Sequence, residues 1–232
     1  MSQKIFQQTV QQFQAPKIIG LALNYGKSSS NNKSKLKEPV FFTKTLNCLT
    51  TETFPNSKIV KLPIAEHLQQ NQLNHELELG FVIGQKGRNI SLDQCERFIG
   101  GYFLCQDITD ATHFGELRNR ALSWELAKCR DYFLPVGEFI EKEKLGDVYD
   151  EVELELKING EQFYKTSTQD MVFNLYEQIS YISKFITLNP GDLILSGTPQ
   201  PAPFKNTDLL EGYLYKNGQI ISELLVKPEI QE

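Results

Sequence analysis

Two glutamates, Glu76 and Glu78, stand two positions apart in a segment where they alternate with Leu77 and Leu79. This alternation predicts a β-strand, on which side chains at positions i and i+2 point to the same face. The two carboxylates would then lie about 7 Å apart along the strand. If they converge in a pocket, their charges repel unless a proton or a cation relieves them. Carboxylate ligands favour a hard divalent ion.

The same tetrapeptide, Glu-Leu-Glu-Leu, occurs a second time at positions 153–156. There it leads into Lys157 and a hairpin turn, so we interpret it as a solvated strand face. The tetrapeptide alone therefore does not identify a metal site. Two further polar residues favour the first copy as a site. Asp107 ends an apolar strand, and Lys128 follows a Trp-Glu-Leu-Ala segment.

The elements that must position these residues are mostly strands. Apolar runs and alternations predict strands at residues 17–23, 38–42, 77–83, 100–106, 152–158 and 192–195. Asn-Gly pairs at 159–160 and 217–218 are typical of hairpin turns. Residues 91–94 fit a capping box that opens a short helix through Phe98, and apolar residues between 172 and 186 share one helical face. We therefore predict a single α+β domain that is mainly β.

Length and composition exclude several classes of protein. The 232 residues are 40% hydrophobic and 23% charged, which are ordinary globular values. A net charge of −5 offers no basic excess for nucleic acid. No apolar run is long enough to cross a bilayer, and the N-terminus lacks the apolar core of a signal peptide. The four cysteines include no Cys-x-x-Cys pair, so we expect a cytoplasmic protein with reduced thiols and with neither nucleic-acid nor membrane partners.

Two segments stand outside the predicted core. Residues 26–37 contain four lysines, no acid and no histidine, which predicts a mobile surface loop. Its lysines would form a cationic lid over a dianionic substrate, or they would simply be solvated. We interpret residues 1–17 as an N-terminal extension of one catalytic domain spanning residues 1–232.

Several short motifs in a fixed order together resemble the fumarylacetoacetate hydrolase family. They lie at residues 24–25, 38–44, 75–80, 100–109, 126–128, 186–188 and 191–199. Their spacing is similar to that of the short single-domain branch, which holds acylpyruvate hydrolases and related isomerases. The resemblance implies a mixed β-roll with flanking helices, usually assembled as a homodimer.

The resemblance also implies roles for individual residues. A Mg²⁺ or Mn²⁺ ion would be held by Glu76, Glu78 and Asp107, and Lys128 matches the family's active-site lysine. Lys128 would steady developing negative charge, or move a proton if desolvation lowers its pKa. The expected substrate-binding residues are Tyr25, Lys44, Gly197 and Thr198.

The sequence departs from the family where hydrolytic members place a His and Glu pair that activates water. No histidine or acid occurs anywhere between positions 26 and 37. Three further positions that are polar in the family are apolar here, namely Leu23, Ala111 and Phe114. We interpret the nearby His113 as a structural or rim residue.

An intact ligand set without the water-activating pair favours isomerisation over hydrolysis. Hydrolysis of a carbon–carbon bond needs a general base, which typically contributes about 10²–10⁴-fold. Tautomerisation, double-bond isomerisation or decarboxylation of a 2-oxo acid needs mainly the ion as a Lewis acid. We therefore expect a metal-dependent isomerase or tautomerase of a small 2-oxo or enol dicarboxylate, with decarboxylation as related chemistry. Two alternatives stay open. One is hydrolysis of acylpyruvates or fumarylacetoacetate-like diketones with an unconventional base such as His113, and the other is a non-enzymatic oxo-acid binder.

Overall fold

The computed structural model describes residues 16–26, 36–146, 148 and 151–231. The strands are β1 (Ile18–Ala22), β2 (Val40–Lys44), β3 (Leu49–Thr50), β4 (Val60–Ala65), β5 (Leu73–His75), β6 (Leu77–Ile83), β7 (Ile99–Gln106), β8 (Thr109–Asp110), β9 (Leu134–Pro135), β10 (Ile140–Glu141), β11 (Val152–Ile158), β12 (Glu161–Ser167), β13 (Leu193–Leu195), β14 (Ala202–Pro203), β15 (Leu210–Lys216) and β16 (Gln219–Gln231). The α-helices are α2 (Ala111–Asn119), α3 (Glu125–Lys128), α4 (Lys142–Leu145) and α5 (Leu175–Phe185). Short 3-10 helices occur at Leu46–Cys48, Glu66–Leu68, Leu92–Phe98 and Thr168–Asp170. Most of the predicted lid and of the predicted N-terminal extension lies outside the described residues.

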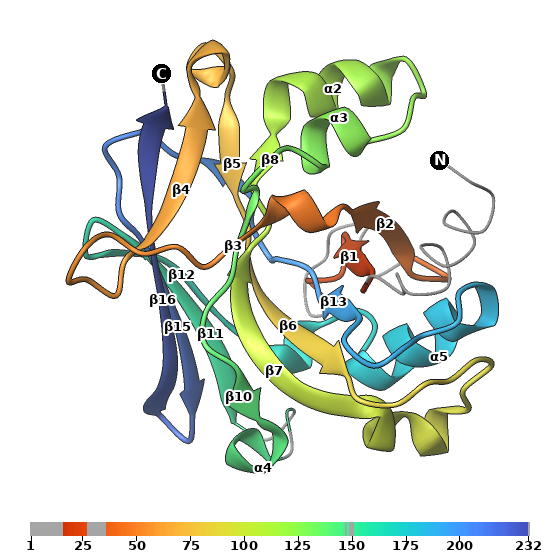
Figure 1. Cartoon of the computed structure of the whole chain (residues 1–232). Helices are drawn as coiled ribbons and strands as arrows, with labels where there is room; N and C mark the ends of the chain where they lie inside the picture. The colour runs from red at the N-terminus through yellow and green to blue at the C-terminus, as the bar shows by residue number, and fades with distance from the viewer. Residues whose placement is uncertain (1–15, 27–35, 147, 149–150, 232) are drawn as a thin grey trace, which may run out of the picture.

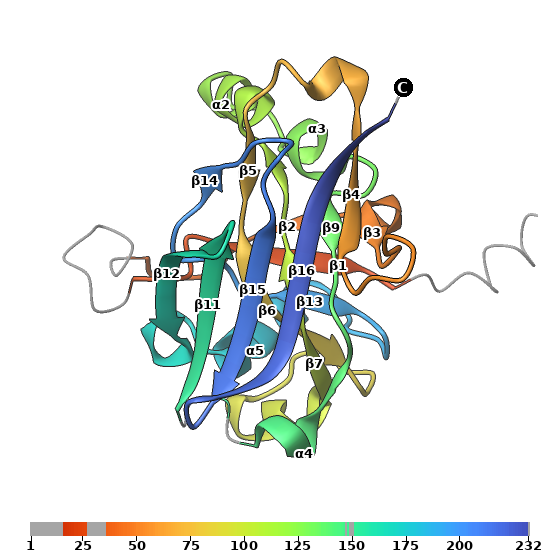
Figure 2. The same cartoon turned by 90° about the vertical axis from the view of Figure 1, so that its left-hand side faces the viewer.

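Two larger sheets dominate the molecule (Figure 1). One has six strands in the order β10-β7-β6-β13-β1-β2, in which β1 and β13 are parallel neighbours. The other has five strands in the order β12-β11-β15-β16-β4, in which β16 and β4 are parallel, and Figure 2 shows these strands side by side. The mainly β, α+β class predicted from the sequence is confirmed.

The main hydrophobic core contains side chains from both large sheets. Leu77 and Leu79 of β6 belong to it, as do Leu154 and Leu156 of β11, and all four are buried. Their alternation with polar residues explains why both segments form strands with one face toward the core. Burying each such leucine contributes about 1.5–3 kcal/mol.

The helices flank the sheets. Helix α5 begins at a capping box, in which the Asn174 side chain accepts from the Glu177 amide and the Glu177 carboxylate accepts from the Asn174 amide. Helices α2 and α3 lie together beyond the ends of β5 and β8 (Figure 1). Within the described part of the chain, no helix has the length and apolar character needed to cross a membrane.

One local prediction is wrong in its mechanism. The helix expected through Phe98 is present, but it is a 3-10 helix without a capping bond from the Ser91 side chain. The amide of Gln94 donates instead to the Ser91 carbonyl oxygen at 3.0 Å. The tighter i to i+3 turn satisfies the amide that the predicted cap would have served.

A small three-stranded sheet, in the order β14-β5-β8, continues from the six-stranded one. Strand β5 directly precedes β6, and β8 closely follows β7. Strands β6 and β7 pair in the six-stranded sheet, and β5 and β8 pair in the small sheet, so the antiparallel pairing of these two chain segments breaks only briefly between the sheets. Glu76 and Asp107 lie at this interruption, where the backbone leaves one sheet and enters the next. The junction between the two sheets therefore positions two of the three predicted metal ligands, Glu76 and Asp107.

Candidate metal centre and adjoining cavity

The register between β6 and β7 brings Glu76 and Asp107 together. Leu77 pairs with Gln106, and just beyond this pair the amide of Asp107 donates to the carbonyl oxygen of Glu76 at 2.9 Å. Glu78 is the second residue of β6 and lies two positions after Glu76, so its side chain points to the same side. The predicted sharing of a face by the two glutamates is present in the structure.

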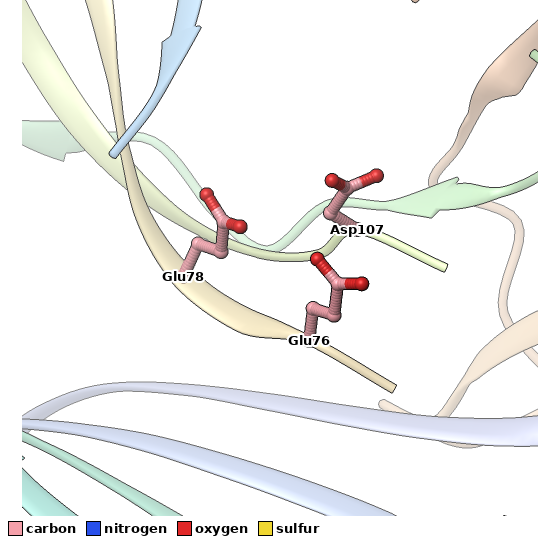
Figure 3. A group of neighbouring side chains, drawn as sticks. All are labelled: Glu76, Glu78 and Asp107. Carbon is pink, nitrogen blue, oxygen red and sulfur yellow. The ribbon is translucent and has the colours of Figure 1, made fainter. Parts of the chain in front are cut away.

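The three carboxylates converge (Figure 3). Glu76, Glu78 and Asp107 each offer one oxygen such that all three atoms lie within 4.8 Å of one another. Ligand bonds to hard divalent ions are about 2.0–2.6 Å long, so one ion can reach three oxygens with this spacing. Glu78 and Asp107 are 1% and 0% exposed, which leaves little water to screen their repulsion. The donor set therefore fits a Mg²⁺-like or Mn²⁺-like ion.

Two buried lysines also contact this cluster. The Lys128 ammonium lies 3.0 Å from Glu76 Oε2 and 2.7 Å from Asp107 Oδ2. The Lys44 ammonium lies 2.7 Å from Asp107 Oδ1. When all three carboxylates are ionised, they face two ammonium groups and leave one negative charge in excess. A divalent cation would convert this excess into a net charge of +1.

Burial and neighbouring charges shift the pKa values of these groups in different directions. Burial raises the pKa of Glu78 well above its usual range, and the charges of Asp107 and Glu76 add to the rise. Burial also raises the pKa of Glu76, against the opposing charge of Lys128. Burial acts on Asp107 as well, but the charges of Lys128 and Lys44 outweigh it and lower its pKa. Burial disfavours the charged form of Lys128, yet Asp107 and Glu76 raise its pKa, so Lys128 is protonated at neutral pH.

The loop after β13 orients one ligand. The Gly197 amide donates to Glu78 Oε2 at 2.6 Å. Gly197 has a φ of +96°, and a Cβ there would lie 2.9 Å from the Asn24 Cβ, so both backbone shape and space require glycine. Thr198 follows, with its hydroxyl 3.2 Å from that of Tyr164.

A cavity of about 230 Å³ adjoins the carboxylates. Among the predicted site residues, Glu76, Lys128 and Thr198 contribute to its lining. Lys44 contacts Asp107 and the Ile108 carbonyl oxygen and is not part of the lining. Tyr25 is 1% exposed within the hydrophobic core and is also absent from the lining. The other lining residues are Leu21, Ala22, Leu23, Phe42, Asn74, Thr109, Ala111, Phe114, Trp124 and Pro201.

Sequence reasoning did not assign roles to several residues at this site. The Thr109 hydroxyl donates to Glu76 Oε1 at 2.7 Å. Its position two residues after Asp107 could have indicated that this hydroxyl lies near the ligands. The Tyr164 hydroxyl donates to the Leu77 carbonyl oxygen at 3.2 Å, which leaves its oxygen free to accept from Thr198. Tyr164 belongs to β12 of the five-stranded sheet, and no local sequence pattern predicts its contact with Thr198.

His113 belongs to a separate cluster. Its Nδ1 lies 2.8 Å from Asp110 Oδ2, and the Arg130 guanidinium also contacts that carboxylate at 2.7 Å. Asp110 in addition accepts from the His113 amide and so caps helix α2. His113 is not among the residues that line the cavity. This placement favours the structural interpretation of His113 over a catalytic one.

Comparison with known proteins gives a consistent result. The family model described as "Fumarylacetoacetate (FAA) hydrolase C-terminal" matches residues 17–224. The chain is 36% identical over 200 residues to "Oxaloacetate tautomerase FAHD1, mitochondrial" of Homo sapiens, covering 85% of this chain and 86% of the relative. It is also 36% identical over 185 residues to "Oxaloacetate decarboxylase, mitochondrial" of Dictyostelium discoideum, covering 79% and 81%.

Solved structures share the fold. Fumarylpyruvate hydrolase from Pseudomonas aeruginosa, solved in complex with Mn²⁺ and pyruvate, superposes with a TM-score of 0.78 at 23% identity. The match covers 94% of this chain and 91% of that one. At this identity the likeness establishes the architecture, which agrees with the mixed β-roll that the family resemblance implies.

Proposed function

The chain belongs to the fumarylacetoacetate hydrolase family of enzymes, and from this premise we propose that it is a divalent-metal-dependent tautomerase or isomerase of a small 2-oxo acid. The observation that carries the proposal is the convergence of Glu76, Glu78 and Asp107 beside a cavity that also exposes Lys128. Two relatives at 36% identity are named for tautomerisation and decarboxylation of oxaloacetate, and both reactions proceed through an enolate.

The bound ion would supply Lewis-acid stabilisation of negative charge on the oxygen of the 2-oxo group. The three carboxylates would hold it, with Glu78 fixed by the Gly197 amide and Glu76 by the Thr109 hydroxyl. These second contacts keep the ligand oxygens oriented without reorganisation during the reaction.

Lys128 stabilises negative charge in this proposal. The charges of Asp107 and Glu76 raise its pKa in the metal-free protein, so its ammonium is available to face an anionic substrate. Its ammonium stands between Glu76 and Asp107 and at the cavity surface, where an anionic substrate would meet it. Thr198, also at that surface, would turn its hydroxyl from Tyr164 to a substrate carboxylate when the substrate binds.

The sequence supports isomerisation over hydrolysis. No histidine or acid occurs at positions 26–37, where hydrolytic members of the family are expected to carry the pair that activates water. His113 is engaged with Asp110, and it does not line the cavity. The base required by the hydrolase alternative is therefore missing from the positions that could best supply it.

The proposal includes three finer points. The ion is Mg²⁺ or Mn²⁺, because both suit all-oxygen ligands. The protein works as a homodimer, as its family resemblance implies. It acts in the cytoplasm, where the four free cysteines would stay reduced.

The test compares the two Glu-Leu-Glu-Leu copies in the same chain. We expect Glu78→Gln to lower the metal-dependent rate of oxaloacetate tautomerisation by at least about 100-fold, the scale of a lost electrostatic contact in the transition state. Glu155→Gln, which changes the second copy, should leave that rate unchanged. The rate is measured above a control containing the metal ion without protein, and pyruvate formation is followed in parallel to detect decarboxylation. Full activity of Glu78→Gln would contradict the proposal.

A further inference from the structure

The lining of the cavity has two chemically different parts. The polar part consists of Glu76, Lys128, Thr109 and Thr198, with Asn74 as one further polar residue. The rest is apolar and comes from separate elements, namely Leu21, Ala22, Leu23, Phe42, Ala111, Phe114, Trp124 and Pro201. A ligand that touches both parts must therefore have one anionic end and one apolar end.

Three of the eight apolar lining residues are aromatic, namely Phe42, Phe114 and Trp124. Trp124 packs against Phe114 with ring centroids 5.1 Å apart and against Phe42 at 5.9 Å. All three rings are half-buried, so each keeps surface that a ligand can cover. The Lys128 ammonium lies 4.7 Å from the centroid of the Phe42 ring, which joins the apolar wall directly to the charged part. A further aromatic ring can pack against this wall in the same tilted or edge-on arrangements.

The charges at the site suit one carboxylate better than two. With a divalent ion, the cluster of three carboxylates and two ammonium groups carries +1, which one substrate carboxylate neutralises. A second carboxylate would need its own cation or N–H donors. In the described lining, Lys128 is the only cationic side chain, and it is already shared by Glu76 and Asp107. Burying an unpaired carboxylate against aromatic rings is unfavourable, because the charge loses its hydration without gaining a partner.

The three positions at which the sequence departs from its family converge on this wall. Leu23, Ala111 and Phe114 come from the loop after β1 and from α2, and all three line the cavity. Each contributes an apolar side chain where a polar one was expected. The departures therefore act at one place, which is the surface that meets the end of the substrate remote from the metal.

The size of the cavity limits that end to a small group. Pockets for drug-sized ligands usually have about 300–1,000 Å³, whereas this one has about 230 Å³. It suits a pyruvate unit carrying one ring or a short branched chain.

We propose that the site selects 2-oxo acids with a single carboxylate and an apolar, preferably aromatic, group on C3, in preference to 2-oxo dicarboxylates. The proposal rests on the tautomerase function argued above and specifies its substrate class. The reaction is balanced without a co-reactant, because one proton leaves C3 and one is added to the oxygen of the 2-oxo group. Leu23, Ala111, Phe114 and Trp124 are the residues that determine this specificity.

The test uses phenylpyruvate and oxaloacetate as matched probes, with Mg²⁺ or Mn²⁺ and a metal-only control. We expect kcat/KM for tautomerisation of phenylpyruvate to exceed that for oxaloacetate by at least tenfold. Leu23→Arg should lower this ratio by at least tenfold, because it places a cation at the wall where a second carboxylate would lie. Leu23 is 50% exposed, so the new charge need not be buried. Ala111→Arg and Phe114→Gln should shift the ratio in the same direction.

Leu126→Arg is the matched control. Leu126 is 64% exposed on α3 and does not line the cavity, so the same charge change close by should leave the ratio within twofold of wild type. An unchanged ratio in Leu23→Arg and Ala111→Arg, or a wild-type preference for oxaloacetate, would overturn the proposed selectivity.

Failure of the two proposals can be told apart by binding. Calorimetric titration of the metal-loaded protein with each probe gives a ratio of dissociation constants even if neither compound turns over. Tighter binding of phenylpyruvate without turnover would support the selectivity and contradict the tautomerase function. Metal-dependent turnover of oxaloacetate in preference to phenylpyruvate would support the tautomerase function and contradict the selectivity.

Discussion

The same tetrapeptide, Glu-Leu-Glu-Leu, has different fates at residues 76–79 and 153–156. In both copies the leucines are buried in the core. In the first copy the glutamates meet a third carboxylate, Asp107, and share two lysines with it. In the second copy Glu153 pairs with Lys165 at 2.8 Å, and Glu155 lies 3.7 Å from Lys157. Two carboxylates are thus matched by two ammonium groups, and no negative charge remains in excess.

Glu155 shows that burial alone does not create a metal site. The second copy was predicted to be a solvated strand face, and this is wrong for Glu155, which is 6% exposed. Its carboxylate accepts from the Tyr215 hydroxyl at 2.5 Å, and this bond, with burial, raises the pKa of Tyr215 to about 12. A neutral donor and a nearby lysine satisfy it locally. What distinguishes the first copy is therefore the uncompensated third charge.

The largest expected effect comes from removing that third charge. Asp107→Asn should leave the Lys44 and Lys128 ammonium groups buried without their shared partner. Breaking a buried ion pair in this way costs about 3–5 kcal/mol, which lowers the melting temperature of a chain of this size by roughly 6–20 °C. Calorimetry or thermal fluorescence measures the loss. The parallel change Glu153→Gln, in the second copy, should alter the melting temperature by no more than about 4 °C.

A smaller effect is expected from pH. The pKa values of Glu76 and Glu78 are raised, so in the metal-free protein the folded state holds protons above the usual carboxylate range near 4.5. Stability from these protons is present at low pH and is lost as pH rises through the folded-state pKa values. Bound metal requires ionised ligands and must displace those protons, so metal affinity should increase with pH.

The measurement is the rise in melting temperature caused by Mg²⁺ at pH 5 and at pH 8. We expect the larger rise at pH 8, since each proton displaced is worth about 1.4 kcal/mol per pH unit until the ligands are fully ionised. In Glu78→Gln the rise should be lost at both values. A Mg²⁺-induced rise that is equal at pH 5 and pH 8 in the wild type would argue against the carboxylates as ligands.

Sequence patterns predicted the parts of this site that depend on local periodicity. Alternation placed Glu76, just before β6, and Glu78, within it, on one face, and the end of an apolar run placed Asp107 after β7. The convergence of all three carboxylates depends on the β6–β7 register and on the break that leads into β5 and β8, and no single segment encodes that register.

The wall of the cavity was not predictable in the same way. The sequence assigned no role in the site to Phe42 or Trp124, because nothing local shows that β2 and the start of α3 meet beside Lys128. Leu23, Ala111 and Phe114 were noticed only as departures from a family pattern. Only the tertiary structure shows that these three residues line the same cavity.

The smallest expected effect tests the balanced state of the second copy. Lys165→Ala removes the partner of Glu153, whose side chain is 38% exposed, and an ion pair this accessible is worth about 0.2–1 kcal/mol. The melting temperature should fall by no more than about 4 °C. The variant also leaves Glu153 and Glu155 with Lys157 alone, so it recreates an excess of one negative charge without a third carboxylate. If excess charge were sufficient for metal binding, Mg²⁺ would stabilise Lys165→Ala more than wild type. We expect the two stabilisations to be equal, because the exposed Glu153 and the buried Glu155, with its Tyr215 partner, offer two carboxylates and not the set of three found at Glu76, Glu78 and Asp107.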